Sequence, residues 1–549
     1  MHELVDVVKG FSTGTMQTLK SDRTGVLHTQ PLNPLLLPEI ARWIYRLSTR
    51  KDGCRLARVC SCLFNSLIPL VWEDINGVEQ LLVLVAGTKI SVDATDNLEI
   101  FMAHKTFTDG DLERFRFYAS FVKHLNSFKI EKYFRYRLRG WKQLLTGLGN
   151  NPLLPKLRSL TFDTRPTTTV FEQQAWFMLL LSPSLQELSL ITISKNSADS
   201  SASAAKLFFK SISTALISRA DSSPPADHSL RSSNQTTVIS TGSEDVEDIS
   251  WLTTVRHLTN LSKLSISMSA LKAGELSTIG LLPQLKSLDL DFDIDHTGES
   301  TLSHTELNLP DDAFPQLRHF GLTNLPDGPS FRGIWDLNPL VSNITSATLR
   351  FNKYRWMAML THDQILCDFI IPISEKSPGI TDLEIHPPEC ESNEKESSGP
   401  MFALLSRLPL TRLRFAPMIS FHTYIPPNIG KYPLLRKLEL TTSWLEVADI
   451  IPLVLVFPNL EYLAMQITVR PEDLQEIRVV NPSPKPITLS VLSVFLEEDP
   501  FWDRTQIGRD LGSLLHSLWP KAQYSTNKSD VLQYNFIPSW ATTQLPAGI

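Results

Sequence analysis

The side chains best suited to chemistry in this sequence are thiols and carboxylates that recur at short intervals. Cys60 and Cys62 lie close enough to bind one zinc ion, but no second pair of Cys or His stands at the spacing that a zinc site needs. Four aspartates alternate along one stretch: Asp289, Asp291, Asp293 and Asp295. Alternation places them on one side of a strand, where they could bind a cation or a basic partner, or form a solvated strand end. We favour the solvated strand end and predict no metal site.

The sequence lacks the common motifs of catalytic and nucleotide-binding sites. It contains no G-x-x-x-x-G-K-[ST] phosphate loop, no G-x-G-x-x-G, no G-x-S-x-G and no H-E-x-x-H. Four histidines in the central part of the chain show no paired spacing: His257, His296, His304 and His319. We therefore predict no catalytic residue, no cofactor and no intrinsic enzyme activity.

A third cluster combines basic and aromatic side chains within residues 117–147. Its bases are Lys129, Lys132, Arg135, Arg137, Arg139 and Lys142. Such a mixture can bind RNA or DNA, because bases stack on aromatic rings and phosphates pair with cations. The alternative is the solvated face of a helical linker. A net charge of −6 and a pI near 6.1 favour that alternative and disfavour a nucleic-acid partner.

The elements that would position any site follow from a leucine repeat. The chain of 549 residues contains 82 leucines and 23 glycines. One motif recurs about eleven times, often after proline. It consists of an apolar residue, two variable residues, a second apolar residue, one variable residue and a third apolar residue. Successive copies begin 24 to 28 residues apart where the spacing is regular. The copies occupy 155–162, 183–190, 259–266, 283–290, 315–322, 342–349, 378–385, 409–415, 433–440, 458–465 and 488–495.

Each copy ends in an alternation that predicts a short strand with one apolar face. A single strand of this length cannot bury that face alone, but stacked copies form a parallel sheet with one continuous core. Segments with helical spacing, at 171–181, 401–408 and 443–457, predict helical returns. The pattern resembles a leucine-rich repeat, although the asparagine that usually follows the strand is missing. The expected fold class is α/β: an irregular solenoid with parallel strands on its concave face and helices on its convex face.

The repeat is interrupted after residue 190. Residues 204–218 can form one return helix, whereas 219–248 are rich in Ser, Thr, Asp and Pro and predict a disordered insert. That insert is either a tolerated insertion or a phosphorylated regulatory loop. The predicted organisation is a disordered tail 1–30, a helical module 31–75, a helical linker or solenoid cap 76–150, a solenoid 151–520 and a tail 521–549.

Three short helices are predicted within the N-terminal module. Pro38 suits the first turn of a helix, and Asp52 suits the N-cap of a second. Apolar residues at helical spacing continue as far as Pro69. So small a unit buries little surface by itself, and a partner is needed to cover its apolar faces.

This module resembles an F-box in its opening residues 37–40, its core residues 57–60 and its closing residues 69–72. Gly53 departs from that family, which often has Leu at the position. An F-box followed by leucine-rich repeats resembles an architecture of large fungal families. The resemblance implies binding to a Skp-type adaptor, and through it to a cullin–RING ligase. The implied adaptor-binding residues are Leu37, Pro38, Glu39, Ile40, Ile44, Leu47, Leu56, Val59, Cys60, Leu63, Phe64 and Trp72.

The resulting hypothesis is a substrate-recognition subunit of a Skp–cullin–F-box type E3 ubiquitin ligase, whose solenoid binds an unidentified protein target. The alternative is a leucine-rich-repeat scaffold independent of ubiquitination. Variable positions of the strand motifs are the candidate target-binding residues: Arg158, Glu187, Lys286, Arg318, Arg412, Lys437 and Glu461. The first 20 residues lack the apolar core of a signal peptide, and no apolar run is long enough to span a membrane. We therefore expect a soluble protein of the cytoplasm or nucleus with no membrane partner.

Overall fold

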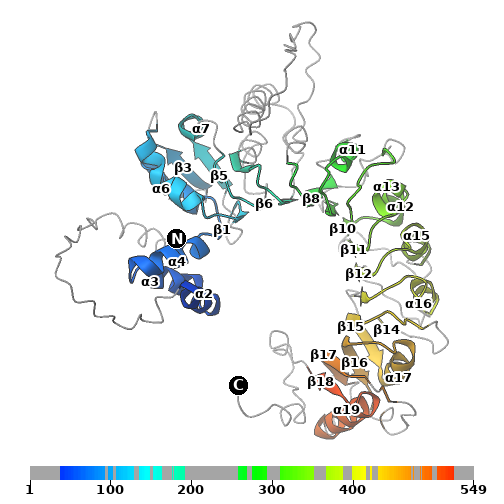
Figure 1. Cartoon of the computed structure of the whole chain (residues 1–549). Helices are drawn as coiled ribbons and strands as arrows, with labels where there is room; N and C mark the ends of the chain where they lie inside the picture. The colour runs from blue at the N-terminus through cyan, green and yellow to red at the C-terminus, as the bar shows by residue number, and fades with distance from the viewer. Residues whose placement is uncertain are drawn as a thin grey trace, which may run out of the picture. The chain divides into compact units, whose positions relative to one another are not determined.

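The computed structural model divides into two compact units, residues 1–264 and 265–549, whose elements are labelled in Figure 1. Each unit is built from short parallel strands joined by return segments. The structure describes residues 38–92, 97–102, 107–128, 135–148, 152–163, 176, 179–191, 258–268, 275–292, 309–351, 366–386, 399–415, 421–422, 431–470, 474, 482–483, 485–496 and 504–524.

In the first unit, four short strands pair in parallel in the order β1-β4-β6-β7. Their bounds are β1 (Asp74–Asn76), β4 (His124–Asn126), β6 (Ser159–Asp163) and β7 (Glu187–Ile191). The next strand, β8 (Lys263–Ser267), contains the boundary between the units.

In the second unit, the parallel strands follow one another in chain order. They are β9 (Ser287–Asp291), β10 (His319–Leu325), β11 (Ser346–Phe351), β12 (Asp382–His386), β13 (Arg412–Phe415), β15 (Lys437–Glu446), β16 (Tyr462–Val469), β17 (Ile487–Leu496) and β18 (Ala522–Tyr524). A short strand, β14 (Phe421–His422), pairs with the C-terminal half of β15. All eleven strands predicted from the leucine repeat are therefore confirmed, as β6 to β13 and β15 to β17.

The core of the second unit is a row of apolar side chains that face one another across successive strands. The register aligns one buried residue from each strand, and every one is fully buried: Leu288, Phe320, Ala347, Leu383, Leu413, Leu438, Leu463 and Leu489. Because side chains alternate along a strand, the intervening positions face the opposite side of the sheet. The same alternation that forms the buried core therefore places the polar side chains on the opposite face of the sheet.

Helical returns cover the apolar face of this sheet, and Figure 1 shows helices along one side of the strands of the second unit. They are α11 (Glu275–Gly280), α12 (Gly328–Trp335), α13 (Asn338–Val341), the π-helix η4 (Leu366–Ile370), α15 (Ile371–Lys376), α16 (Gly399–Leu405), α17 (Val447–Val456) and α19 (Arg504–Leu518). The returns bury aromatic side chains, and Phe331 stacks on Trp335 with ring centroids 4.8 Å apart. The helix expected at 443–457 begins four residues late, because β15 continues to Glu446.

The expectation of a mostly helical stretch at 76–150 is wrong. Beside α5 (Glu79–Leu82), α6 (Asp109–Ala119) and α7 (Trp141–Leu148), this stretch supplies β4 and a separate three-stranded sheet. That sheet pairs β2 (Thr88–Val92), β3 (Asn97–Met102) and β5 (Arg135–Arg139). Alternate residues of β3 are buried, so the period of two that predicts a strand was present in this stretch of the sequence. The parallel strands also begin at β1 rather than after residue 150, and β18 lies within the expected C-terminal tail.

The N-terminal module consists of α2 (Pro38–Leu47), α3 (Arg50–Ala57) and α4 (Ser61–Val71), as predicted in number. Two details differ. Thr49, not Asp52, caps α3, and its hydroxyl accepts the backbone N–H of Asp52. Cys60 caps α4 rather than continuing α3, and α4 runs through Pro69. The predicted N-terminal tail, the helix at 204–218 and the insert at 219–248 lie outside the described residues, as does most of 171–181.

Candidate functional site

Helix α2 presents an apolar surface to solvent. Ala41 is its one buried residue, whereas Trp43 exposes 63% and Leu47 exposes 71% of its surface. Among the other residues implied by the F-box resemblance, Val59 is 70% exposed. Five more are exposed or half-buried: Pro38, Glu39, Ile40 and Ile44 on α2, and Leu56 on α3. Trp43 was missed by the sequence reasoning, although its spacing of four from Leu47 was a visible signal.

Other implied adaptor residues contribute to packing within the first unit. Trp72 is 3% exposed, and its ring lies 4.6 Å from that of Tyr118 on α6. Phe64 stacks on Phe117 of the same helix at 6.5 Å, and Leu63 is buried. These contacts attach the three-helix module to the rest of the first unit. Cys60 accepts the N–H of Leu63 at its sulfur, and Leu37 lies outside the described residues.

Gly53 has a structural reason within this module. A Cβ at this position would lie 2.3 Å from the ring of Tyr45, so a side chain there would displace that ring. The Tyr45 hydroxyl in turn donates to the carbonyl of Leu70, which ties α2 to α4. Burial raises the pKa of Tyr45, so the hydroxyl keeps its proton and remains a donor at neutral pH. Gly53, which departs from the F-box resemblance, thus lies directly against the ring of Tyr45 on α2.

The predicted target-binding residues do not form one cluster. Arg158 and Glu187 belong to the first unit, and the other five to the second. Lys286, Arg318 and Glu461 directly precede their strands and are exposed. Glu461 pairs with Arg436 at 2.9 Å, while the Arg318 guanidinium donates to two backbone carbonyls. Of the predicted set, the structure brings Arg412 and Lys437 together.

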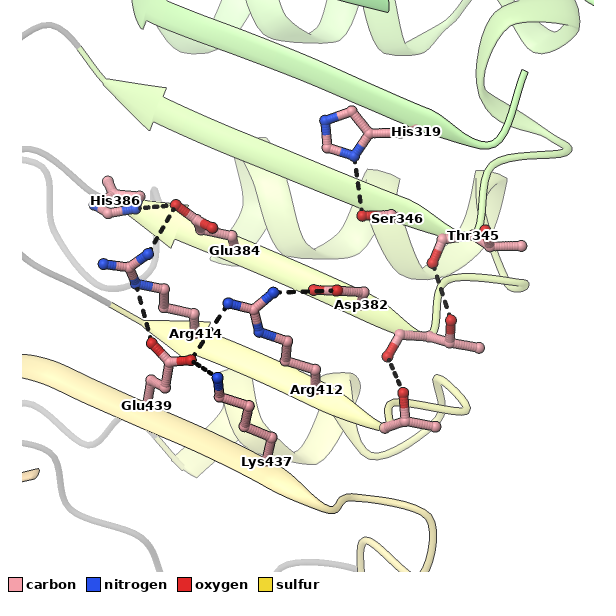
Figure 2. A network of polar contacts seen from close by, with 12 residues as sticks. His319, Thr345, Ser346, Asp382, Glu384, His386, Arg412, Arg414, Lys437 and Glu439 are labelled. Carbon is pink, nitrogen blue, oxygen red and sulfur yellow. Dashed lines mark hydrogen bonds and ion pairs between the residues drawn. The ribbon is translucent and has the colours of Figure 1, made fainter. Parts of the chain in front are cut away.

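These two residues share a carboxylate on the polar face of β12, β13 and β15, shown in Figure 2. Glu439 receives Lys437 Nζ at 2.8 Å and Arg412 Nη2 at 3.3 Å, and Arg414 Nε lies 3.4 Å away. Arg412 also reaches Asp382 on the neighbouring strand at 3.5 Å. Sequence reasoning missed the carboxylates, although alternating charges in Asp382–His386 and in Lys437–Leu438–Glu439 were visible.

A second carboxylate, Glu384, organises the adjoining part of this network. It accepts a hydrogen bond from Arg350 at 2.9 Å and contacts His386 Nε2 at 2.6 Å, with Arg414 at 3.5 Å. The His386 hydrogen bond, supported by Arg350 and the charge of Arg414, lowers the pKa of Glu384 from 4.5 to about 2. Burial acts to raise the pKa of Glu439, but Lys437 and the two arginines outweigh it and the pKa falls. Both carboxylates are therefore ionised at neutral pH.

Threonine hydroxyls connect the starts of β10, β11, β12 and β13 in the same unit, and Figure 2 labels Thr345 among them. Thr345 donates to the carbonyl of Arg318, Thr381 to that of Thr345, and Thr411 to that of Thr381, at 3.1–3.3 Å. Each of these carbonyls also accepts backbone N–H groups of the next strand. These hydrogen bonds form a threonine ladder, which links successive repeats at the start of each strand. The asparagine that is missing from this repeat would have stood after the strand.

Removing one rung should weaken the second unit measurably. We expect Thr381→Val to lower the free energy of unfolding by about 0.5–1 kcal/mol, the usual worth of one hydrogen bond. Urea unfolding of the full chain measures this loss. Thr381→Ser keeps the hydroxyl and serves as the control; a serine variant as unstable as the valine variant would show that the hydroxyl is not responsible.

The basic–aromatic segment is partly neutralised. Arg139 lies 2.9 Å and Arg137 lies 3.9 Å from Glu99 on the neighbouring strand β3. Lys129 and Lys132 lie outside the described residues. Within the part of the chain that the structure describes, no group of three or more His, Cys, Asp or Glu is arranged to hold a metal ion. No helix among those residues has the length and hydropathy to cross a membrane.

Comparisons with known proteins give fold likenesses alone. No family model matches the chain, and no curated protein matches its sequence. Solved structures that match include the TLR13–ssRNA13 complex, with a TM-score of 0.32 and 14% identity over 76% of this chain. That match spans 56% of the TLR13 chain. An internalin (InlF) from Listeria monocytogenes matches with a TM-score of 0.28 and 13% identity, over 82% of this chain and 88% of the internalin.

A leucine-rich-repeat protein from Leptospira interrogans matches with a TM-score of 0.26 and 12% identity, over 77% of this chain and 93% of its own. None of these values reaches the similarity at which two chains superimpose throughout. The fold of the present chain is defined by its own strands, their parallel register and their helical returns. By these features the chain has an α/β fold of the leucine-rich-repeat type, with a short helical module at its N-terminal side.

Proposed function

We propose that this protein is the substrate-recognition subunit of a Skp–cullin–F-box type ubiquitin ligase. In this proposal the three-helix module binds a Skp-type adaptor, and the polar face of the repeats binds a protein target. The observation that carries the proposal is the uncovered apolar face of α2, in a module whose residues resemble an F-box.

That face has the chemistry of a docking surface. A helix with one buried residue gains little from its own packing, and an exposed Trp beside an exposed Leu is costly in water. Trp is also among the residues that contribute most when buried at an interface. Ile40 and Ile44, half-buried on the same helix, extend the apolar area. An adaptor that covers this helix would recover the hydrophobic free energy that the module alone leaves unused.

The repeats supply the second requirement of such a subunit. Their strands are held in register by a buried apolar row and, on β11 to β13, by the threonine ladder. A target held on a fixed surface has a high effective concentration near the catalytic partner of the ligase, so no bond chemistry is required of this chain.

A second candidate function is a protein-interaction scaffold that acts without ubiquitination. The charged network on β12, β13 and β15 favours it, because that surface needs no adaptor in order to bind a partner.

Adaptor capture distinguishes the two functions. Purified Skp-type adaptor should be retained by the full chain, and Trp43→Ala with Leu47→Ala should weaken retention at least tenfold, as expected for truncation of an interface hot spot. Leu455→Ala, a truncation of another exposed apolar residue on α17, is the matched control and should leave capture unchanged. Failure of the wild-type chain to capture adaptor, or unchanged capture by the double variant, would exclude the ligase function and leave the scaffold.

A further inference from the structure

We propose that the polar face of β11, β12, β13 and β15 binds an acidic, Asp- and Glu-rich peptide segment of the protein target. The binding surface is a cationic ridge, defined as Arg350, Arg412, Arg414 and Lys437 (Figure 2 shows the last three). This inference deepens the proposed function, since it rests on target binding by the repeats and names the chemistry of the target.

The charges of this face are arranged in two layers. The side chains of the ridge are 32–52% exposed. The side chains of Glu384 and Glu439, which pair with them, are 13% and 11% exposed. These two carboxylates therefore lie beneath the cations, and an approaching partner meets positive charge first except at Asp382, which is 36% exposed. A partner with negative side chains would gain from this potential in both encounter rate and orientation.

Neighbouring strands hold the two arginines of β13 in place. Arg412 contacts Asp382 of β12 and Glu439 of β15, at 3.5 and 3.3 Å. Arg414 contacts Glu384 of β12 and the same Glu439, at 3.5 and 3.4 Å. Each guanidinium is thus fixed between carboxylates on both sides. An arginine that is already oriented loses less conformational entropy on binding a carboxylate than a free one does.

The network retains an excess of positive charge. Four cations of the ridge face three carboxylates, those of Asp382, Glu384 and Glu439. The pKa values of both glutamates are lowered, so these carboxylates stay charged at neutral pH and the excess is one positive charge.

The spacing of the ridge suits an extended peptide. Arg412 and Arg414 are two residues apart on one strand, which separates them by about 7 Å, the distance between same-face side chains of an extended chain. Lys437 lies beside Arg412 in the strand register and rests 4.7 Å from the ring centre of Tyr462. A nucleic-acid backbone is a poorer match, because its charge is continuous and would meet Asp382, whereas a peptide can place an uncharged residue opposite that carboxylate.

The test uses the full chain and a fluorescently labelled oligoglutamate peptide, followed by anisotropy. Arg350→Gln with Lys437→Gln removes two exposed cations while Glu384 keeps Arg414 and His386, and Glu439 keeps Arg412 and Arg414. No carboxylate loses all its partners, so folding should persist. The double variant should bind roughly tenfold more weakly, at two- to fivefold for each exposed charge. Oligoglutamine of equal length should not bind.

The matched control removes the same charge from the helical returns. Arg332→Gln with Lys376→Gln, on α12 and α15, should bind oligoglutamate as the wild type does. Equal losses in both double variants, unchanged binding by the ridge variant, tighter binding of oligouridylate, or binding of a phosphoserine peptide without binding of oligoglutamate would each overturn the inference. Adaptor capture is measured in parallel. Loss of oligoglutamate binding by the Arg350→Gln, Lys437→Gln variant, with normal adaptor capture, supports the cationic ridge as the peptide-binding surface. Peptide binding without any adaptor capture would refute the ligase function alone.

Discussion

Trp72→Ala should lower the local stability of the three-helix module by about 3–5 kcal/mol, the range for truncating a buried Trp. Trp72 follows α4 directly and packs against Tyr118 of α6, so its removal opens a cavity where the module meets the rest of the first unit. Because the chain has two compact units, a local measurement is required. Amide hydrogen exchange of α2 to α4 should become faster, while exchange in β9 to β17 stays unchanged.

Trp43→Ala is the matched control, since it truncates the same residue type on the same module at an exposed position. It should change stability by less than about 0.5 kcal/mol, as expected for a surface substitution. The two variants thus separate packing from binding: Trp72→Ala loosens the module, and Trp43→Ala lowers adaptor capture without loosening it. Normal exchange protection in Trp72→Ala would refute the packing role that its burial indicates.

Glu384→Gln should destabilise the second unit by about 2 kcal/mol at neutral pH. The pKa of Glu384 is lowered from 4.5 to about 2, which corresponds to roughly 3 kcal/mol, and solvent screening at the half-exposed Arg350 reduces the value. A carboxyl group whose pKa is lowered by folding stabilises the protein above its unfolded pKa, and this stabilisation is lost as the pH falls through the folded pKa. The wild-type advantage should be constant above pH 4.5 and fall below about 0.5 kcal/mol near pH 2.

Urea unfolding of the wild type and of Glu384→Gln, from neutral pH down to pH 2, measures this difference in the free energy of unfolding. The groups around Glu384 are Arg350, Arg414, His386 and, through Arg412, Asp382, and all remain present in the variant. Glu461→Gln is the control, because that carboxylate is exposed, pairs with Arg436 at the surface and should contribute less than about 0.5 kcal/mol. A difference between wild type and Glu384→Gln that does not vary with pH would show that the charge of Glu384 is not the stabilising feature.

The N-terminal module shows where local sequence reasoning succeeds and where it stops. Proline at the start of α2 and the apolar spacing correctly predicted three short helices. The assignment of Asp52 as a cap was wrong because Thr49 also carries a capping hydroxyl, and Asp52 supports it from the first turn. Whether an apolar residue faces a partner or the chain itself cannot be read from spacing: Trp43 and Trp72 differ in burial because Tyr118 lies beside one of them.

The sequence by itself determined the repeat architecture of this protein. Alternating leucines every 24 to 28 residues where the spacing is regular predicted eleven strands, and all eleven form, because such strands can bury their apolar side only by stacking. The tertiary structure alone decided which charges meet. Arg414 and Glu384 are 30 residues apart in the chain, and they become neighbours through the register of β12 and β13. The return segments differ in length from repeat to repeat, so chain separation does not reveal this register, and the charged network exists only once the buried row has aligned the strands.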